Sequence, residues 1–410
     1  MRNNSIIPCR PLATYGVDLK QVISMLLAPA LLGCTLMLGA STAFAQYKQK
    51  NLVSDKTGMA LRTDPNLLDA WGMAELPDGG FIVADALSGF VTFYARSGKT
   101  LRPPVTVPAA PSLPPGTPGS PAGLVSNPTS EFVISKNGKS APALYLFSTL
   151  DGLICGWNPT VDPDNAIIVV DNSTLTPFPA SYDDLTMTRN KYGQMVIYAV
   201  DSGVSATQSN NDVEIYDGNF NLLNRFTDSS APSDMTAYSA RIVNGKVYVT
   251  YAGFTPQAGG VVDIFDTEGN MLRRFAANSS SGPLQAPWEV ILAPANFGWA
   301  SHQLLIGEVD SGNISVFNPT TGAFLGQLTD AHGKPIVIDG VWALIFARRE
   351  RGERSPQLFF AAGCAFPPSY SPSLFGLITV TDGDDGKKQE AGSLSLPLAQ
   401  PKSRISPREN

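Results

Sequence analysis

Residues 307–326 read GEVDSGNISVFNPTTGAFLG, and this stretch decides the fold because its pattern recurs along the chain. It contains an apolar run, a turn with Asp and Gly, an alternating segment that reaches an aromatic residue, and a second turn. Alternation of apolar and polar residues is typical of a half-buried strand, and Gly, Asn and Asp favour tight turns. The stretch therefore predicts a hairpin of two strands followed by a turn into a third.

The same pattern occurs at five other places. The copies begin with FIVADALSGF at Phe81, LYLFSTLDG at Leu144, VIYAVDSG at Val196, KVYVTYAG at Lys246 and QLFFAAG at Gln357. A further apolar strand precedes each copy; these strands begin with AWGMAELP at Ala70, PWEVILAP at Pro287 and VWALIFA at Val341, with weaker versions at Ala122, Asp184 and Tyr238. Each repeat is thus expected to be a unit of four antiparallel strands.

Four-stranded units that repeat every roughly 50–60 residues are the blades of a β-propeller. Six of them predict an all-β, six-bladed propeller over residues 46–382. The composition agrees, because only 16% of the residues are charged while Gly and Pro, which punctuate short strands, number 37 and 33. No sustained helical periodicity follows residue 46, which excludes a helical bundle.

Three segments lie outside this repeat. Residues 47–55, YKQKNLVSD, are strand-like, and we expect them to close the ring as the outer strand of the last blade; the alternative is a solvated arm. The Pro-rich residues 102–123 are interpreted as a connection too polar and stiff to join a sheet. Residues 383–410 carry no aromatic side chain and are predicted to be disordered.

Residues 1–45 are expected to be a signal peptide. Basic residues precede the apolar run at 22–40, and STAFAQ then provides a small-residue site for cleavage after Ala45. This predicts a secreted or periplasmic protein with no stable membrane span after cleavage. Two alternatives are an uncleaved membrane anchor, since the run approaches the length of a bilayer span, and a lipoprotein, since LLGC precedes residue 35.

Two cysteines remain after such cleavage, Cys155 and Cys364. They fall in the second and sixth repeats, and blades two apart in a ring meet only near its axis. A disulfide requires Cα atoms within about 7 Å. We therefore expect buried free thiols and no zinc site, because no Cys/His cluster accompanies them.

Several phrases resemble an uncharacterised family of exported bacterial proteins with NHL-like six-bladed propellers, some of which carry a C-terminal sorting tail. The similar phrases are DAWGMA, GPLQAPWEVILAPANFG, GKPIVIDGVWALIFA, NLVSD, DGLICGWNP and FNPTTGAFLGQLTD. The resemblance implies the fold and export but no activity. This chain departs from it in two ways: its tail has no apolar sorting segment, and Glu289 follows Trp288 where the resemblance implies Gly.

Propeller geometry places the starts of the inner strands and the turns after the second strands on one rim of the channel. The candidate binding residues on that rim are Trp71, Asp85, Asp201, Trp288, Glu289, Asp310, Asp339 and Trp342. One interpretation is structural, with turn-forming aspartates and packed tryptophans. The other is a binding site in which acids and aromatic side chains converge.

The rim suggests binding more than catalysis. We expect a monomer that binds a small molecule, a glycan or a protein. A net charge of -6 without a basic patch argues against nucleic acid as a partner. Asp85, Asp201 and Asp310 could instead hold Ca²⁺, which prefers six or more oxygen ligands. The alternative function is therefore a calcium-dependent, lactonase-like hydrolase at the same rim; no G-x-S-x-G or P-loop motif points to another enzyme class.

Overall fold

The computed structural model describes residues 46–203, 210–253, 259–278, 282–349, 352–353, 355–364 and 371–381. The predicted signal peptide and C-terminal tail lie outside these residues. The described chain is built of strands, with one short 3₁₀ turn, η1 (Gly298–Ala300). It contains no helix long and apolar enough to cross a membrane.

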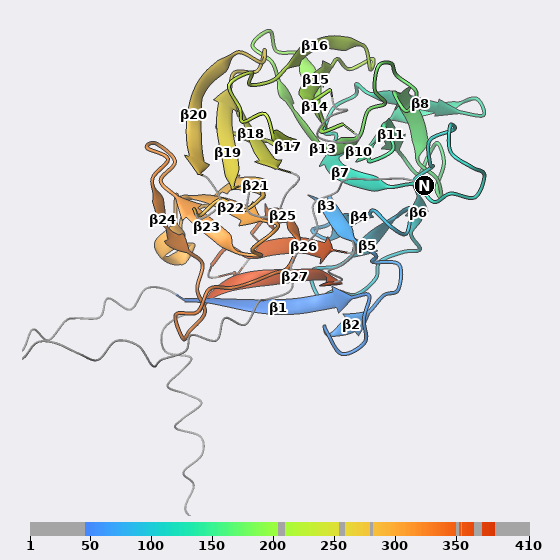
Figure 1. The fold of residues 1–410 in the computed structure, drawn as a ribbon. Helices are drawn as coiled ribbons and strands as arrows, with labels where there is room; N and C mark the ends of the chain where they lie inside the picture. The colour runs from blue at the N-terminus through green and yellow to red at the C-terminus, as the bar shows by residue number, and fades with distance from the viewer. Residues whose placement is uncertain are drawn as a thin grey trace, which may run out of the picture.

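Six antiparallel sheets follow one another around a ring, so the predicted six-bladed propeller is confirmed (Figure 1). Blade 1 contains β3 (Ala70–Glu75), β4 (Phe81–Asp85), β5 (Phe90–Tyr94) and β6 (Val105–Thr106). Blade 2 contains β7 (Pro121–Ser126), β10 (Tyr145–Thr149), β11 (Leu153–Trp157) and β12 (Ile167–Asp171). Blade 3 contains β13 (Tyr182–Arg189), β14 (Met195–Asp201), β15 (Asp212–Tyr216) and β16 (Leu222–Phe226).

The second half of the chain continues the pattern. Blade 4 contains β17 (Met235–Val243), β18 (Lys246–Gly253), β19 (Gly260–Phe265) and β20 (Met271–Asn278). Blade 5 contains β21 (Pro287–Leu292), β22 (Leu304–Glu308), β23 (Ile314–Phe317) and β24 (Phe324–Gln327). Blade 6 contains β25 (Val341–Phe346), β26 (Leu358–Cys364), β27 (Ser371–Thr381), β1 (Gln46–Ser54) and β2 (Arg62–Thr63).

The N-terminal strand closes the ring, as predicted. β1 pairs antiparallel with β27, from Gln46 opposite Thr381 to Ser54 opposite Leu374, and the two lie side by side in Figure 1. The Tyr47 hydroxyl donates to the Phe297 carbonyl at 2.9 Å and so ties this strand to blade 5 as well. The two ends of the described chain therefore stabilise each other through main-chain pairing, which leaves no open edge between the first and last blades.

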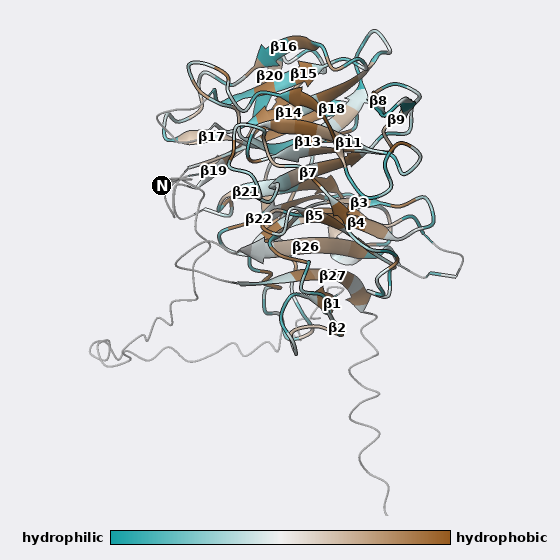
Figure 2. Ribbon diagram, turned by 90° about the vertical axis from the view of Figure 1, so that its right-hand side faces the viewer, coloured by the Kyte–Doolittle hydropathy of each residue, from teal (hydrophilic) through white to brown (hydrophobic). Residues whose placement is uncertain are grey.

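The strands have the burial that stacked blades impose. Second strands such as β4 and β14 are buried at every position, because neighbouring sheets cover both of their faces. Outer strands such as β16 are mostly exposed and more polar (Figure 2). At the centre the inner strands touch backbone to backbone: a Cβ added to Gly123 of β7 would lie 2.3 Å from the Leu185 amide nitrogen of β13.

The interpretation of residues 102–123 as a segment outside the sheets was wrong in part. Val105 and Thr106 pair with Val91 and Phe90 and supply the outer strand of blade 1. Val105 is fully buried between blades 1 and 2, so the apolar residues between the prolines outweigh the stiffness of the segment. Blade 2 also carries a hairpin that the repeat did not predict, formed by β8 (Val133–Lys136) and β9 (Lys139–Pro142).

Strand register defines the two faces of the ring. The second strands end where the inner strands begin, since Asp85 pairs with Ala70, Asp201 with Tyr182 and Glu308 with Pro287. We call this end of the ring the mouth face. Cys155, in the middle of β11, is a buried free thiol as expected, and burial raises its pKa.

Candidate functional site

The three predicted rim tryptophans pack against one another at the centre of the mouth face. The rings of Trp71 and Trp342 stack with centroids 4.0 Å apart, and Trp288 meets them edge-on at 5.2 and 4.7 Å. Tyr238 of blade 4 packs edge-on against Trp288 at 5.3 Å. None of these four side chains is more than 4% exposed. They form an aromatic cluster in the core, not an exposed platform for a ligand.

Glu289 lies deeper in the ring, in a buried ion network between inner strands. Arg241 of β17 donates through Nε to Glu289 of β21 at 2.6 Å, and through Nη1 to Asp184 of β13. The Leu344 amide of β25 donates to the other Glu289 oxygen at 3.3 Å. Burial raises the pKa of Glu289, and the Arg241 charge opposes this. Glu289, which was predicted to lie on the rim, therefore joins neighbouring blades through a buried ion pair with Arg241. Arg241 and Asp184 were not identified from the sequence as members of this network.

The predicted aspartates do not form one ring. Within the described chain, the only group of three or more possible metal ligands whose ligand atoms all lie within 4.8 Å of one another consists of Asp201, Asp212 and Glu214. Asp85 and Asp310 do not belong to it. Asp339 lies exposed on the loop before β25, where it accepts a hydrogen bond from Ser371 at 3.2 Å.

The strand register also corrects the expectation that Asp310 is the residue of blade 5 equivalent to Asp85 and Asp201. Glu308, and not Asp310, occupies the position of Asp85 and Asp201 at the end of a second strand. Asp201 accepts the Ser181 N–H at 2.9 Å, and Glu308 accepts the Gln285 N–H at 2.6 Å. Both acids thus anchor the connection into their own inner strand, which supports the turn-chemistry interpretation for this position.

Asp85 is the exception among these three. It is fully buried, and neither carboxylate oxygen makes a hydrogen bond in the described part of the chain. The Asp69 amide, which enters the same inner strand, donates to Ser373 Oγ at 2.7 Å instead. Burial raises the pKa of Asp85 well above its usual range; Thr92 beside it has the opposite influence, although its hydroxyl lies outside hydrogen-bond geometry.

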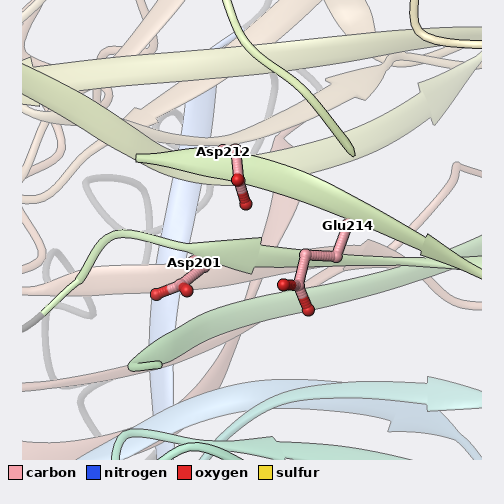
Figure 3. Close-up of side chains that lie close together, drawn as sticks. All are labelled: Asp201, Asp212 and Glu214. Atoms are coloured by element: carbon pink, nitrogen blue, oxygen red, sulfur yellow. The ribbon is translucent and has the colours of Figure 1, made fainter. Parts of the chain in front are cut away.

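The carboxylates of Asp201, Asp212 and Glu214 point toward one another in blade 3 (Figure 3). Asp201 ends β14, while Asp212 and Glu214 project from the same side of β15 because they are two residues apart. Burial raises the pKa of Asp201 to about 6. Burial and the charges of Glu214 and Asp201 raise that of Asp212 to about 7. Groups with such pKa values can exchange protons near neutral pH.

Glu214 itself is already engaged. It accepts hydrogen bonds from the hydroxyls of Tyr182 and Tyr216, both at 2.5 Å, and from Arg225 Nε at 2.8 Å. The pair Glu214–Arg225 has a counterpart in blade 4, where Arg274 Nε donates to Asp263 at 3.0 Å across the corresponding strands. A third-strand acid paired with a fourth-strand arginine is thus a repeated structural device in these two blades.

Two further acids, Asp183 and Asp310, lie near Tyr238 on the mouth face. Burial raises the pKa of Tyr238 well above its usual range, and the nearby carboxylates of Asp183 and Asp310 raise it further. Burial also raises the pKa of Asp183; Ser202 has the opposite influence, and the charge of Asp201 adds to the rise. We call the set Asp183, Asp201, Asp310 and Tyr238, from blades 3, 4 and 5, the acidic mouth. Asp183 was missed because its position in the first strand has no acidic counterpart in the clearer repeats.

Comparisons with known proteins find similarity to uncharacterised viral proteins. It is 29% identical over 321 residues to the uncharacterised protein R648 of Acanthamoeba polyphaga mimivirus, which covers 75% of each chain. It is 27% identical to L690 of the same virus, over 80% of this chain and 84% of that one. No family model matches.

Among solved structures, a gluconolactonase from Xanthomonas campestris aligns with a TM-score of 0.47 at 12% identity, over 77% of this chain and 88% of that one. A likeness at this level says nothing about activity. The similar proteins come from a virus, whereas the resemblance in the sequence implied a bacterial source. A bacterial source therefore stays a prediction.

Proposed function

We propose that the protein is a ligand-binding propeller whose acidic mouth receives a positively charged group. The observation that carries this proposal is that Asp183 and Asp310, from blades 3 and 5, lie near Tyr238 of blade 4, with Asp201 near Asp183. Carboxylates crowded in a partly dehydrated rim attract a cation more strongly than the same groups in water. The aromatic cluster closes the channel beneath, so a ligand would rest at the mouth and not pass through the ring.

Two acids of the mouth, Asp183 and Asp201, have no basic partner among the described residues. Asp201 accepts hydrogen bonds from Ser181, Gly203 and Asn210, all of them neutral donors. Asp183 makes no ion pair with a basic residue within the described ranges, and the nearest buried arginine, Arg241, is already bound to Asp184 and Glu289. A cationic group of a small molecule or of a partner protein would supply the missing charge.

Calorimetric titration with spermidine at low ionic strength tests this function. We expect binding that weakens with salt, and loss of most of the heat in the Asp183→Asn/Asp310→Asn double variant. Asp164→Asn is the control, because it removes an exposed carboxylate from the β11–β12 turn on the opposite face. Equal binding by the wild type and the double variant, or no binding by either, would contradict the proposal.

A calcium-dependent hydrolase is the second candidate, favoured by the compact group of Asp201, Asp212 and Glu214. Three carboxylates offer the oxygen ligands that Ca²⁺ prefers, and a bound metal would polarise a substrate carbonyl or activate water. The fit is incomplete, because Glu214 already holds Tyr182, Tyr216 and Arg225. A melting temperature that rises with Ca²⁺ and falls with EDTA in the wild type, but not in Asp212→Asn, would support this candidate.

We also propose export, on the small-residue site that follows the apolar segment. The expected mature protein begins at Gln46, the first residue of β1. Intact-mass measurement of the protein from the periplasm or culture medium tests this, and a full-length mass in the membrane fraction would contradict it.

A further inference from the structure

A cavity of about 420 Å³ opens between blades 1 and 2, on the face opposite the mouth. It lies where β3 turns into β4 and where β10 begins and β11 ends. The volume is in the range of pockets that hold small organic molecules. Nothing in the repeat or in the proposed function assigns it a role.

Buried aromatic rings line the cavity. The Trp157 ring lies 5.5 Å from that of Phe93 and 6.3 Å from that of Tyr145, and each of the three side chains is at most 4% exposed. Leu101 and Leu144 also line it and are 43% and 42% exposed. The rings form the buried floor of the cavity, and a flat apolar body placed over Leu101 and Leu144 would remove the apolar surface of these leucines from water.

One guanidinium lies against the same rings. The Arg102 ζ carbon is 5.0 Å from the centroid of Phe93 and 4.9 Å from that of Trp157. Its Nη2 donates to the Pro163 carbonyl at 2.6 Å and its Nε to the Pro103 carbonyl at 3.3 Å. Nη1 makes no hydrogen bond or ion pair in the described part of the chain, so a positively charged donor is available beside the aromatic rings.

The wall of the cavity also holds a buried donor without an acceptor. Trp157 is 4% exposed, and its indole N–H makes no hydrogen bond to any described residue. A buried donor left unsatisfied costs about 1–3 kcal/mol. The unsatisfied indole N–H of Trp157 and the Nη1 of Arg102 both indicate that a ligand with an oxygen acceptor binds near the Trp157 ring.

We propose that this cavity binds a small planar carboxylic acid, with its ring against Leu101 and Leu144 and its carboxylate at Arg102. Apolar walls alone would accept any hydrophobic molecule, and the guanidinium selects an anion through a charge-assisted hydrogen bond. Asp78, an exposed residue at the β3–β4 turn, is the one acid in the lining and weakens the binding of an anion by repulsion.

The alternative is that Arg102 only joins two blades. Blade 4 contains such a joint: the Arg273 ζ carbon lies 5.3 Å from the Phe275 centroid, and its Nη2 donates to the Thr320 carbonyl of blade 5 at 3.0 Å. Arg273 therefore has the same ring contact and the same bond to the next blade, but it does not line this cavity. It provides a matched control for the arginine itself.

The test is calorimetric titration of the full-length protein with 2-naphthoate, and with 2-naphthamide as the neutral analogue. We expect naphthoate to bind, naphthamide to bind about tenfold more weakly, and Arg102→Gln to remove that difference. Arg273→Gln should bind naphthoate as the wild type does. If Arg102→Gln fails to fold, Asp78→Asn, a change at an exposed turn, should tighten naphthoate binding and leave naphthamide unaffected.

Absence of naphthoate binding would overturn the proposal. Equal affinities for naphthoate and naphthamide would show that the cavity is an apolar pocket without selectivity for anions. Equal losses of naphthoate affinity in Arg102→Gln and Arg273→Gln would show that both arginines only connect neighbouring blades. Because the cavity and the acidic mouth lie on opposite faces, the double variant of Asp183 and Asp310 should leave naphthoate binding unchanged. The two proposals can therefore fail separately.

Discussion

The indole of Trp71 stacks on that of Trp342 at 4.0 Å, and this contact joins the first blade of the ring to the last. Each tryptophan is the second residue of its inner strand, so the repeat brings them to the same level of the channel. The Trp342 indole N–H donates to the Gly363 carbonyl at 2.6 Å, which fixes the orientation of the ring. The contact is thus part of the closure of the ring.

Replacement of Trp342 by Ala is expected to lower the free energy of unfolding by about 3–5 kcal/mol, because it removes a large buried side chain and leaves a cavity. Urea unfolding followed by circular dichroism measures the change. Tyr192→Ala is the control, since this side chain is 72% exposed and should contribute less than about 0.5 kcal/mol. If Trp342→Ala lowers the free energy of unfolding by less than about 1 kcal/mol, the propeller tolerates a cavity at the centre of the ring.

Arg241→Met should destabilise the protein by about 3–5 kcal/mol, because Asp184 and Glu289 would remain buried without their counter-charge. The triple variant Arg241→Met, Asp184→Asn, Glu289→Gln should recover much of this loss, since no buried charge remains. Chemical denaturation of the two variants compares them. Failure of the triple variant to recover stability would show that the network acts through geometry more than through charge.

Asp85→Asn is expected to raise the free energy of unfolding at pH 7 by at least about 1.4 kcal/mol, the equivalent of one pKa unit, since burial raises the pKa of Asp85 well above its usual range and an amide has no charge to suppress. The equivalent substitution Asp201→Asn should instead lower stability, because that carboxylate accepts hydrogen bonds from Ser181, Gly203 and Asn210. Thermal unfolding of both variants provides the comparison. The same sign at both positions would contradict the distinction between them.

Stability should decrease as the pH rises from 5 to 8. In the folded protein the pKa values of Asp201 and Asp212 are raised to about 6 and about 7, above the value of about 3.9 for an unfolded aspartate. Such groups contribute their stabilisation fully below the unfolded pKa, and this contribution is lost as the pH rises through the folded pKa. The melting temperature should decline less steeply with pH in Asp212→Asn than in the wild type. An identical dependence on pH would contradict the raised pKa of Asp212.

The binding of a cation at the acidic mouth should show the opposite trend with pH. Protons compete with the cation for Asp201, so spermidine affinity should rise between pH 5 and pH 7 as this carboxylate ionises. Calorimetry at constant ionic strength measures this. An affinity that does not change with pH would exclude Asp201 from the site.

Much of the fold could be predicted from the sequence, whereas the candidate site could be predicted only in part: Asp201 and Asp310 were expected on the rim, and Asp183 and Tyr238 were not. The repeat beginning at Phe81 and its relatives located the second and third strands, since alternation and turn residues are local properties. The acidic mouth also depends on Asp183, which comes from another repeat than Asp310 and has no acidic counterpart in the clearer repeats. Their meeting at Tyr238 is a consequence of how the blades are arranged around the axis.

The sequence by itself determined the number of blades, the order of their inner, second and third strands and the role of the first strand as the closing strand, because each depends on a pattern readable along the chain. Only the tertiary structure decided which rim residues are buried. Trp71, Trp288 and Trp342 could have lined an open channel, but six inner strands converging on one axis leave room only for packed rings. Likewise Glu289 belongs to a buried ion network because Arg241 reaches it from the neighbouring blade, a contact that no spacing within one repeat reveals.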